Sequence, residues 1–489
     1  MRWDWSLLAP EYLLAGWAAL MALLGLWGRL RAYWLGYVAA AGALASAATS
    51  LIWLGDRTAF GDLLAVDHYT TFFRVTFGLI AASVCLISAG YVERFLRHHG
   101  EYYAILVVSV IGATYMAAAQ ELLSAYIALE LLSFSLYVLA SYAKMDLRSN
   151  EGGLKYMLLG AFSSALFLYG LGLIYAVTKT THYQGIAEAL AGDLGGTKGL
   201  ALLGLSLIVV GLGFKVSAVP FHMWAPDAYE GAPLPVTAFI SAISKAAGFA
   251  LFLKLMVQAF LPLHDDWSPL LASLATVTML LGNLVAVHQR NIKRLLAYSS
   301  IGQVGYLLAG IAALSPETAN AASAVLLHLA GYVISNLAAF ACVTVYYNWT
   351  GKEDIYEYRG LAERAPFVAL ALSISLFSLA GMPLFAGFVT KFVLFQAIAE
   401  ADLLWLAAVA VFASFVSLYY YLMVMRQMYL VEPETRERLG VAWPEYGLVA
   451  VLVVAIFVVG LGPQPLFNAA QEAASLVYQG AATFAALSP

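Results

Sequence analysis

The sequence predicts an all-α polytopic membrane protein, and three observations support this prediction. Of its 489 residues, 62% are hydrophobic and only 11% are charged, and the mean hydropathy is +0.82. Soluble globular domains carry roughly 25% charged residues, so this chain is too apolar to cover an aqueous surface. Apolar runs of about 20 residues, the length of a spanning helix, recur along the whole chain. The net charge of −4 shows no basic surplus, so we expect a lipid bilayer and no nucleic acid as partner.

Apolar windows predict about fourteen transmembrane helices. They lie near residues 9–27, 33–54, 70–92, 102–119, 121–143, 154–177, 199–224, 233–260, 268–288, 295–313, 320–347, 366–395, 403–429 and 445–462. The division between the fourth and fifth is the least marked, because only Gln120 and Glu121 interrupt a 42-residue run. One span does not need that length, so two helices and a tight turn are expected.

The distribution of lysine and arginine predicts which side each loop faces. Of the 25 such residues, fifteen fall in the odd-numbered loops. Five fall in the termini and even-numbered loops, namely Arg2, Arg57, Arg74, Lys179 and Lys198. Cytoplasmic loops of membrane proteins carry an excess of these residues. We therefore expect the odd-numbered loops, including the one around Arg290–Arg294, in the cytoplasm, and both termini on the non-cytoplasmic side.

The remaining five cations are all lysines inside predicted spans, and one acidic residue lies at mid-span. These six are Lys155, Lys215, Lys245, Lys254, Lys391 and Glu130. A charge at the centre of a spanning helix costs at least about 2.5–3.5 kcal/mol on insertion scales. A long side chain near a helix end can reach the lipid headgroups. That suits Lys254 and is an open alternative for Lys155, but it is awkward for Lys215, Lys245 and Glu130.

The use of lysine in place of arginine indicates proton exchange. Arginine does not release its proton in proteins, whereas the pKa of lysine shifts readily on burial. Moving a lysine pKa from about 10.4 to near 7 requires roughly 4–5 kcal/mol of destabilisation of the charged form. Partial burial supplies that scale, and a nearby carboxylate opposes it. A Glu–Lys pair whose separation changes is therefore a proton switch.

Polar side chains recur at helical spacing around these charges. The four stripes are Tyr126, Glu130, Ser133, Tyr137 and Ser141; Thr237, Ser241, Lys245 and Gly248; Ser299, Gln303 and Tyr306; and His328, Tyr332, Ser335 and Asn336. Residues three and four apart share a helix face, and polar residues also hold membrane helices together. Each stripe alone is compatible with packing, but four of them, two with buried charges, favour a hydrated interior path.

Two spans are predicted to be broken helices. Pro220 follows Lys215 in one, and Gly381, Pro383 and Gly387 precede Lys391 in the other. Proline removes a helical hydrogen bond and clashes with the preceding turn. Breaks at corresponding places in two halves indicate an inverted-repeat transporter core, although kinks without function are also common in membrane helices. The match is imperfect, because the lysine precedes its proline in one half and follows it in the other.

These patterns predict two inverted five-helix repeats with additional helices at each end. The expected organisation is a three-helix segment over 1–95, a first repeat over 102–260, a second over 267–431, and a C-terminal helix with an interfacial tail over 445–489. Cys85 and Cys342 both lie in apolar runs, without a CxxC pair or a Cys/His cluster. Neither a metal site nor an iron–sulfur centre is therefore expected in this chain.

Several stretches resemble the antiporter-like subunits of complex I. They are ALELLSFSLYVL (128–139), GGLKYMLLGAFSSALFLYGL (152–171), KVSAVPFHMWAPDAYEGAPLPVTAFISAISKAAG (215–248), QRNIKRLLAYSSIGQVGY (289–306) and SLAGMPLFAGFVTKF (378–392). The resemblance covers roughly residues 100–430. Among these subunits, the chain is most similar to the subunit N class, called NuoN in bacteria and NdhB in plastids. The segment 224–239 distinguishes that class from its paralogues. Some members carry a histidine where this chain has Gln303, so an essential histidine at that step is in doubt.

The resemblance implies a fourteen-helix core and a set of functional residues. Glu130 resembles the acid that pairs with the broken-helix lysine Lys215. Lys245 resembles the central connecting lysine, and Lys391 the exchange site of the second half-channel. Further path residues would be Lys155, Ser241, Gln303, Tyr306 and His328. Residues at the breaks with a gating or structural role would be Pro220, His222, Asp227 and Pro383.

The function that the resemblance implies is proton translocation by one membrane-arm subunit of an NADH:quinone oxidoreductase of the complex I type. This chain would bind no cofactor, and quinone, flavin and iron–sulfur centres would be used by other subunits. Its partners would be other antiporter-like subunits and small helical subunits, in a bacterial inner membrane. Three alternatives stay open: a subunit of a multisubunit cation/proton antiporter, a non-pumping membrane scaffold, and a solute transporter.

The predicted orientation is testable by cysteine labelling from each side of intact cells. Because cations concentrate in the odd-numbered loops, a cysteine introduced at Gln289 should react with a membrane-impermeant thiol reagent only from the cytoplasm. Reaction of that cysteine from outside would overturn the orientation.

Overall fold

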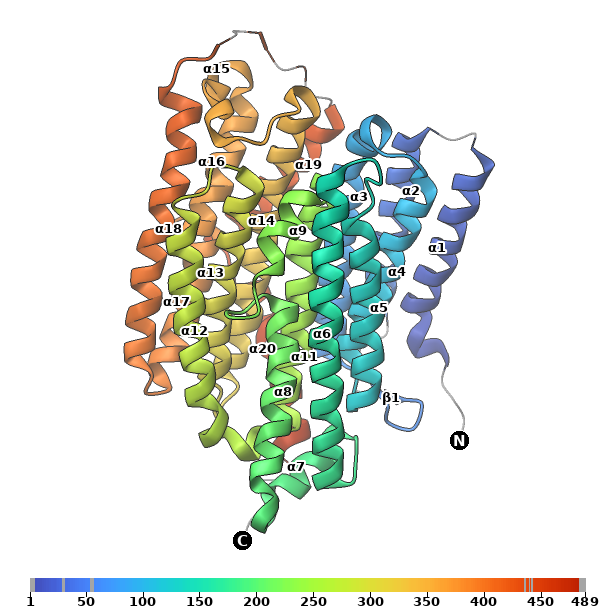
Figure 1. Ribbon diagram of the computed structural model, residues 1–489, viewed down its shortest axis with the longest axis vertical. Coiled ribbons are helices and arrows are strands. Elements are labelled where there is room, and N and C mark those ends of the chain that lie inside the picture. Colours follow the sequence, from blue (N-terminus) through green and yellow to red (C-terminus); the bar gives the residue numbers. More distant parts are fainter. Residues whose placement is uncertain are drawn as a thin grey trace.

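Long helices pack side by side in one bundle in the computed structural model (Figure 1), which describes residues 5–28, 31–52, 57–434, 437–438, 440 and 443–482. Twelve helices of this part are long and apolar enough to cross a membrane by length and composition. This confirms an all-α polytopic fold. It does not confirm the count of fourteen, because the second and twelfth predicted spans are not among the twelve. Residues 53–54 of the second span, and Arg2, Arg29 and Arg436 of the orientation argument, lie outside the described residues.

The first segment contains three helices and a small hairpin. Its elements are η1 (Trp5–Leu8), α1 (Ala9–Trp27), α2 (Ala32–Ser50), β1 (Arg57–Ala59), β2 (Leu64–Val66) and α3 (His68–Phe95). Strands β1 and β2 pair antiparallel, with Arg57 opposite Val66. The carboxylate of Asp67 caps α3 by accepting from Thr70 N at 2.7 Å, a common way to satisfy a free amide at a helix start.

The next elements lie in the part of the chain where the first repeat was predicted. They are α4 (His99–Ala118), α5 (Leu122–Ala140), α6 (Leu147–Thr178), α7 (Tyr183–Ala191), η2 (Gly195–Thr197), α8 (Lys198–Val216), α9 (Trp224–Gly231), α10 (Leu234–Phe239), η3 (Ile240–Ser244, a π-helical turn), α11 (Lys245–Gln258) and η4 (Leu261–Leu263). Helix α4 ends at Ala118 and α5 begins at Leu122, so the expected turn at Gln120 is confirmed.

The second half begins with two antiparallel helices and contains the second break. Its elements are α12 (His264–Ala286), α13 (Ile292–Ala312), α14 (Asn320–Thr350), η5 (Ile355–Tyr358), α15 (Leu361–Arg364), α16 (Pro366–Ala380), α17 (Ala386–Glu400), α18 (Leu404–Leu430), α19 (Trp443–Leu461) and α20 (Gln464–Ala482).

Both predicted broken helices are confirmed. Helix α8 ends at Val216, where Ser217 has a left-handed backbone with φ of 68°, and the chain resumes as α9. Helix α16 ends at Ala380, where Gly381 has φ of 86°, and the chain resumes as α17. Each half-helix of the second break is short, which explains why no single long helix covers the predicted span 366–395.

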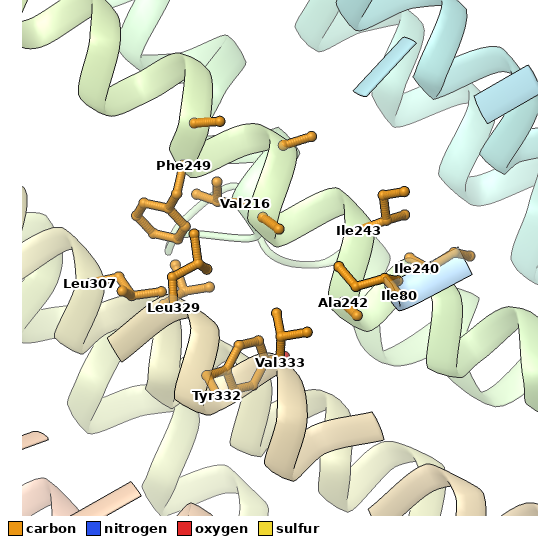
Figure 2. Packing of buried hydrophobic residues seen from close by; sticks show 14 of the residues in the cluster. Ile80, Val216, Ile240, Ala242, Ile243, Phe249, Leu307, Leu329, Tyr332 and Val333 are labelled. Carbon is orange, nitrogen blue, oxygen red and sulfur yellow. The ribbon is translucent and has the colours of Figure 1, made fainter. Parts of the chain in front are cut away.

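Burial increases from the flanks of the bundle to its centre. Every residue from Leu234 to Gln258 is buried, and α13 and α14 are nearly so. Figure 2 shows η3 and α11 packed against Leu329, Tyr332 and Val333 of α14. Helices α6, α18 and α19 instead expose apolar side chains along one face, as lipid-facing or partner-facing helices do. Three of the four polar stripes therefore lie on the most buried helices, whereas the stripe with Glu130 lies on α5, which exposes one apolar face.

The charge count misplaced one cation. Arg74 was assigned to an even-numbered loop, but it lies inside α3 and is buried. Its guanidinium forms a bidentate pair with Glu11 of α1, with Nε–Oε1 at 2.7 Å and Nη2–Oε2 at 2.8 Å. Nη2 also donates to Leu7 O at 3.2 Å. The pair fastens the first helix to the third in a region where an unpaired charge would be costly.

The C-terminal tail forms a helix that packs on the bundle. Residues 464–482 form α20, which contacts α3, α11 and α14. Gln258 Nε2 donates to Val477 O at 3.4 Å, and His68 Nδ1 lies 3.3 Å from Glu472 Oε1. In Figure 1, this helix ends near α7 and the β1–β2 hairpin, at the lower end of the bundle.

Removing the carboxylate of the buried pair should destabilise the protein strongly. Glu11→Ala leaves Arg74 buried without its partner, which costs about 3–5 kcal/mol for such pairs. Thermal unfolding in mild detergent should show a lower midpoint for Glu11→Ala. Glu101→Ala removes an exposed acid, 3.9 Å from His98, and should leave the midpoint unchanged. Equal midpoints for the two variants would contradict a stabilising role of the buried pair.

Candidate functional site

Lys215 occupies the last turn of α8, beside the first break. It is 2% exposed, and its Nζ donates to Ser133 Oγ of α5 at 2.9 Å. Its backbone carbonyl accepts from Ser244 Oγ of η3 at 2.9 Å. Lys215 is thus held between α5 and the π-helical turn that leads into Lys245.

Glu130 does not contact Lys215 in this conformation. The Ser164 hydroxyl of α6 donates to Glu130 Oε1, and Ser164 Oγ lies 3.1 Å from Tyr126 Oη. No ion pair within 4.0 Å joins Glu130 to Lys215, both of which are described, although the Glu130 charge acts on Lys215 electrostatically. The two residues of the predicted switch pair are therefore close enough to interact electrostatically, but each is hydrogen-bonded to a different serine.

Lys245 lies on the other side of the same break. It is fully buried and follows directly after the π-helical turn. Its Nζ donates to Ser217 Oγ at 2.6 Å, and it lies 5.0 Å from the Trp224 ring and 5.6 Å from the Tyr229 ring. The aromatic faces of α9 stabilise a cation there. Ser217, the partner of Lys245, lies only two residues after Lys215 in the chain, so the two lysines lie close to the same break.

Lys391 lies against the end of the other half-helix at the second break. Its Nζ donates to Leu379 O at 2.9 Å, to Ala380 O at 3.3 Å and to Ser414 Oγ at 3.1 Å. These carbonyls belong to the last turn of α16, where backbone acceptors have no intrahelical partner. The ring of Tyr306 lies 4.8 Å from Nζ.

A small apolar pocket reaches Lys391 from the flank of the bundle. Its volume is about 240 Å³, and α17 and α18 line it with Phe388, Phe392 and Phe415, which are exposed. The sequence did not predict this pocket.

Hydroxyl and amide groups occupy the region between Lys245 and Lys391. Tyr332 Oη lies 2.8 Å from Ser300 Oγ and donates to Ser241 O at 3.0 Å. Asn336 Nδ2 donates to Ser241 Oγ at 2.6 Å. Of the predicted path residues, Ser241 thus belongs to a hydrogen-bonded group between the two halves.

The other predicted path residues gather near Lys391. Gln303 Nε2 donates at 3.0 Å to Leu379 O, the same carbonyl that accepts from Lys391. His328 Nδ1 lies 3.1 Å from Thr390 Oγ1, and its ring lies 6.3 Å from that of Tyr306. Gln303, Tyr306 and His328 therefore lie together near Lys391.

Sequence periodicity missed three hydroxyls that contact the buried charges. They are Ser164, Ser217 and Ser414, the partners of Glu130, Lys245 and Lys391. Ser164 and Ser414 lie on α6 and α18, which carry no polar stripe, and Ser217 lies in the break itself. Only its position beside Pro220 marks Ser217 in the sequence.

Lys155 belongs to a surface cluster and not to the buried chain. It lies 2.7 Å from Glu151 Oε1 and 2.9 Å from Asp227 Oδ2. Arg294 Nη1 of α13 donates to Asp227 at 2.9 Å and to Glu230 at 2.8 Å. We call Lys155, Asp227, Arg294 and Glu230 the α9 clamp, because they tie α9 to α6 and α13. Burial raises the pKa of Asp227, but hydrogen bonds from Lys155 and Arg294 and their charges lower it further than burial raises it.

The remaining predicted residues at the breaks are His222, Pro220 and Pro383. His222 is buried, and its Nδ1 has no hydrogen-bond partner among the described residues. Pro220 and Pro383 lie in the turns that separate the half-helices. In the described part of the chain, no cluster of three His, Cys, Asp or Glu side chains is arranged to hold a metal ion.

Lys254 does not reach the lipid headgroups, so the expectation of snorkelling is wrong. It is fully buried, and its Nζ donates to Ala117 O at the end of α4, at 2.8 Å. The Tyr69 ring of α3 lies 5.7 Å away. The helix pattern placed Lys254 near a helix end but did not show that three other helices cover that end.

Buried lysines at two helix breaks, inside a polytopic bundle, define the class of ion-translocating membrane proteins. Residues 119–417 match the family described as NADH:quinone oxidoreductase/Mrp antiporter, TM. NADH-quinone oxidoreductase subunit N of Moorella thermoacetica is 44% identical over 90% of this chain and 91% of its own length. NAD(P)H-quinone oxidoreductase subunit 2 of Thermosynechococcus vestitus is 40% identical over 90% of this chain and 87% of its own.

The solved structures agree with these relatives. A chain of respiratory complex I from Thermus thermophilus has a TM-score of 0.79 at 30% identity, over 95% of this chain and 99% of its own. A chain of the archaeal membrane-bound sulfane sulfur reductase has a TM-score of 0.85 at 26% identity, over 97% and 98%. The chain therefore belongs to the NADH:quinone oxidoreductase/Mrp antiporter family, in its subunit N class.

Loosening the α9 clamp should increase the mobility of α9. Asp227→Asn removes the charge that Lys155 and Arg294 share, so amide hydrogen exchange over residues 224–231 should become faster. Asp193→Asn is the control. Asp193 is exposed and accepts a hydrogen bond from Gly195 N of its own loop at 2.9 Å, so its substitution should leave the exchange over residues 224–231 unchanged. Because the folded pKa of Asp227 is lowered, the clamp is at full strength at neutral pH and weakens only as pH falls through that lowered value. Unchanged exchange in Asp227→Asn would show that the clamp does not hold α9.

Proposed function

We propose that this chain translocates protons as a membrane-arm subunit of a complex I-type NADH:quinone oxidoreductase, without a redox centre of its own. The observation that carries the proposal is the convergence of Lys215 and Lys245 on one helix break, with Lys391 at a second. Three buried amines with hydroxyl partners are an expensive arrangement that packing alone does not need. Proton exchange explains why all three are lysine.

The contacts suggest an order of proton transfer. A proton on Lys215 is next to Ser133, and Ser217 bonds Lys245 one turn of chain away. From Lys245, the group formed by Ser241, Ser300, Tyr332 and Asn336 leads towards α14 and the second half. Lys391 then exchanges the proton with its surroundings. Water molecules would complete the steps between hydroxyls.

Glu130 supplies the control of this transfer. In the separated arrangement its carboxylate is bonded to Ser164, and Lys215 is bonded to Ser133. Closing the distance stabilises the protonated form of Lys215, and opening it favours release. Quinone reduction elsewhere in the complex would supply the energy, since one proton crossing 100 mV requires about 2.3 kcal/mol.

The setting of the subunit follows from its family. Other antiporter-like and small helical subunits would cover the exposed apolar faces of its outer helices, in a bacterial inner membrane. Both termini would lie on the non-cytoplasmic side. Quinone, flavin and iron–sulfur centres would belong to other subunits, and this chain would bind none of them.

Substitution of Lys391 tests proton exchange separately from charge. Lys391→Arg keeps the charge and nearly the length, but arginine does not release its proton. In the assembled complex, Lys391→Arg should lower the proton pumping that is driven by quinone reduction. The loss should be about as large as in Lys391→Ala. Lys215→Ala should show the same loss.

Lys144→Arg, at an exposed loop position, is the matched control and should pump normally. Normal pumping by Lys391→Arg, with a loss only in Lys391→Ala, would show that this position supplies charge and not proton exchange. Normal pumping by Lys391→Ala and Lys215→Ala together would favour a scaffold.

A further inference from the structure

A large polar cavity lies at the end of the bundle that carries the β1–β2 hairpin. Its volume is about 780 Å³, and it is lined by the hairpin, by Asp67 at the start of α3, by the turn between α4 and α5, and by α7, α11 and α20. The lining side chains are mostly charged or amide groups, including Asp62, Asp67, Glu188 and Gln258. By the charge distribution of the loops, this end faces the non-cytoplasmic side.

Two side chains connect this cavity to a buried lysine. Gln258 lines the cavity, is 8% exposed, and its Oε1 has no hydrogen-bond partner among the described residues. It lies one helical turn beyond Lys254 on the same face of α11. Asp67 also lines the cavity and acts on Lys254 by its charge, and Tyr69, two residues later, lies with its ring 5.7 Å from Lys254 Nζ.

The amine of Lys254 is only partly satisfied as a cation. An ammonium group has three donors. Within the described residues, Lys254 Nζ donates to one acceptor, Ala117 O at 2.8 Å. The exposed fraction of the side chain is zero. A buried charge with unmet donors is costly, so the neutral amine is accessible here, whereas a fully bonded ammonium would be locked.

Asp67 is the acid whose charge acts on the buried amine of Lys254. Helix α4 offers Lys254 a backbone carbonyl, and α8 places Lys215 towards the other end of α11. The titratable groups that the neighbouring elements bring to this end are Arg57 and Asp62 of the hairpin, Asp67 just before α3, His68 and Tyr69 of α3, Glu121 before α5, His182, Tyr183 and Glu188 around α7, His264 and Asp265 of α12, and Glu472 and Tyr478 of α20. His68 is paired with Glu472, and Glu121 bonds Ser124.

We infer that Lys254 is a second proton-exchange site, which takes up and releases protons through Asp67 and the cavity at the hairpin end. It is separate from the chain of Lys215, Lys245 and Lys391. No hydrogen-bonded path between Lys254 and Lys245 is present in the described residues. The two lie on opposite faces of α11, about 13 Å apart along its axis.

The link between the two lysines is electrostatic, and it rests on the proposed proton translocation. Charges inside a buried helix are weakly screened, so a proton on Lys254 disfavours a proton on Lys245. The proton concentration at the hairpin end thereby regulates how readily the central lysine is loaded. Only the protonation state of Lys254 changes, since the proton moves between its Nζ and the water of the cavity.

The first test measures access to the cavity without measuring activity. In the assembled complex, Gln258→Cys should react with a membrane-impermeant maleimide from the non-cytoplasmic side. Met256→Cys, fully buried two residues earlier, should not react. The two native cysteines, Cys85 and Cys342, are buried and give a low background. Absence of labelling at Gln258→Cys would overturn the inference.

The second test separates proton exchange from a structural role at the end of α4. Lys254→Arg keeps a cation for the Ala117 carbonyl but holds its proton, and Lys254→Met removes the cation. Both should make proton pumping insensitive to pH at the non-cytoplasmic side. Asp67→Asn should shift that pH dependence while preserving the helix cap, because asparagine caps helices as well as aspartate. Asp193→Asn, which changes an exposed acid outside the cavity lining, is the matched control and should keep the wild-type pH dependence.

Wild-type pH dependence in Lys254→Arg, with a change only in Lys254→Met, would show a structural cation and overturn the inference. If Lys215→Ala and Lys391→Ala lose pumping while all Lys254 variants keep the wild-type pH profile, the proposed function stands and this site fails. If Lys215→Ala and Lys391→Ala pump normally, it is the proposed function that fails.

Discussion

The cost of an ammonium group in a low-dielectric interior is the constraint on which the rest of this structure depends. Each buried lysine must find acceptors where regular helices offer none, because the carbonyls of an intact helix are already bonded. The chain meets this requirement largely at helix ends. Lys391 bonds the last carbonyls of α16, and Lys254 bonds the end of α4. At the start of α13, Lys293 donates to Ala232 O, just past the end of α9. The negative end of a helix dipole favours a cation at each of these places.

The buried lysines differ in how completely they are bonded, and this difference bears on function. Lys391 has three acceptors, whereas Lys215 and Lys245 each have one hydroxyl among the described residues. A hydroxyl both donates and accepts, so Ser133 and Ser217 tolerate a neutral amine as well as an ammonium. Backbone carbonyls only accept, and they favour the charged form. In the proposed pathway, the first break is thus arranged for transfer, and the second holds a proton more firmly until its surroundings change.

Much of the candidate site was predictable because its chemistry depends on residue type and helical spacing. Lysines in apolar runs are rare and conspicuous, and prolines and glycines mark the breaks beside Lys215 and Lys391. The positions of Gln303, Tyr306 and His328 on one side of the second half follow from the stripes of α13 and α14. Sequence reasoning failed where a contact joins distant segments without a periodic signal. Arg74 was counted as a loop cation because nothing local indicates Glu11, and Lys254 was assigned to lipid because its covering helices lie far away in sequence.

The sequence by itself determined the membrane class, the broken helices, the family and the residues proposed to exchange protons, because these follow from composition, local backbone chemistry and motif spacing. Only the tertiary structure decided which groups touch. It separated Glu130 from Lys215, brought Ser217 to Lys245, moved Lys155 to the surface cluster with Asp227, and buried Lys254 beneath a polar cavity. The physical reason is that the state of a buried charge depends on acceptors within about 3 Å. Those acceptors come from helices whose relative rotation and depth no single-helix pattern specifies.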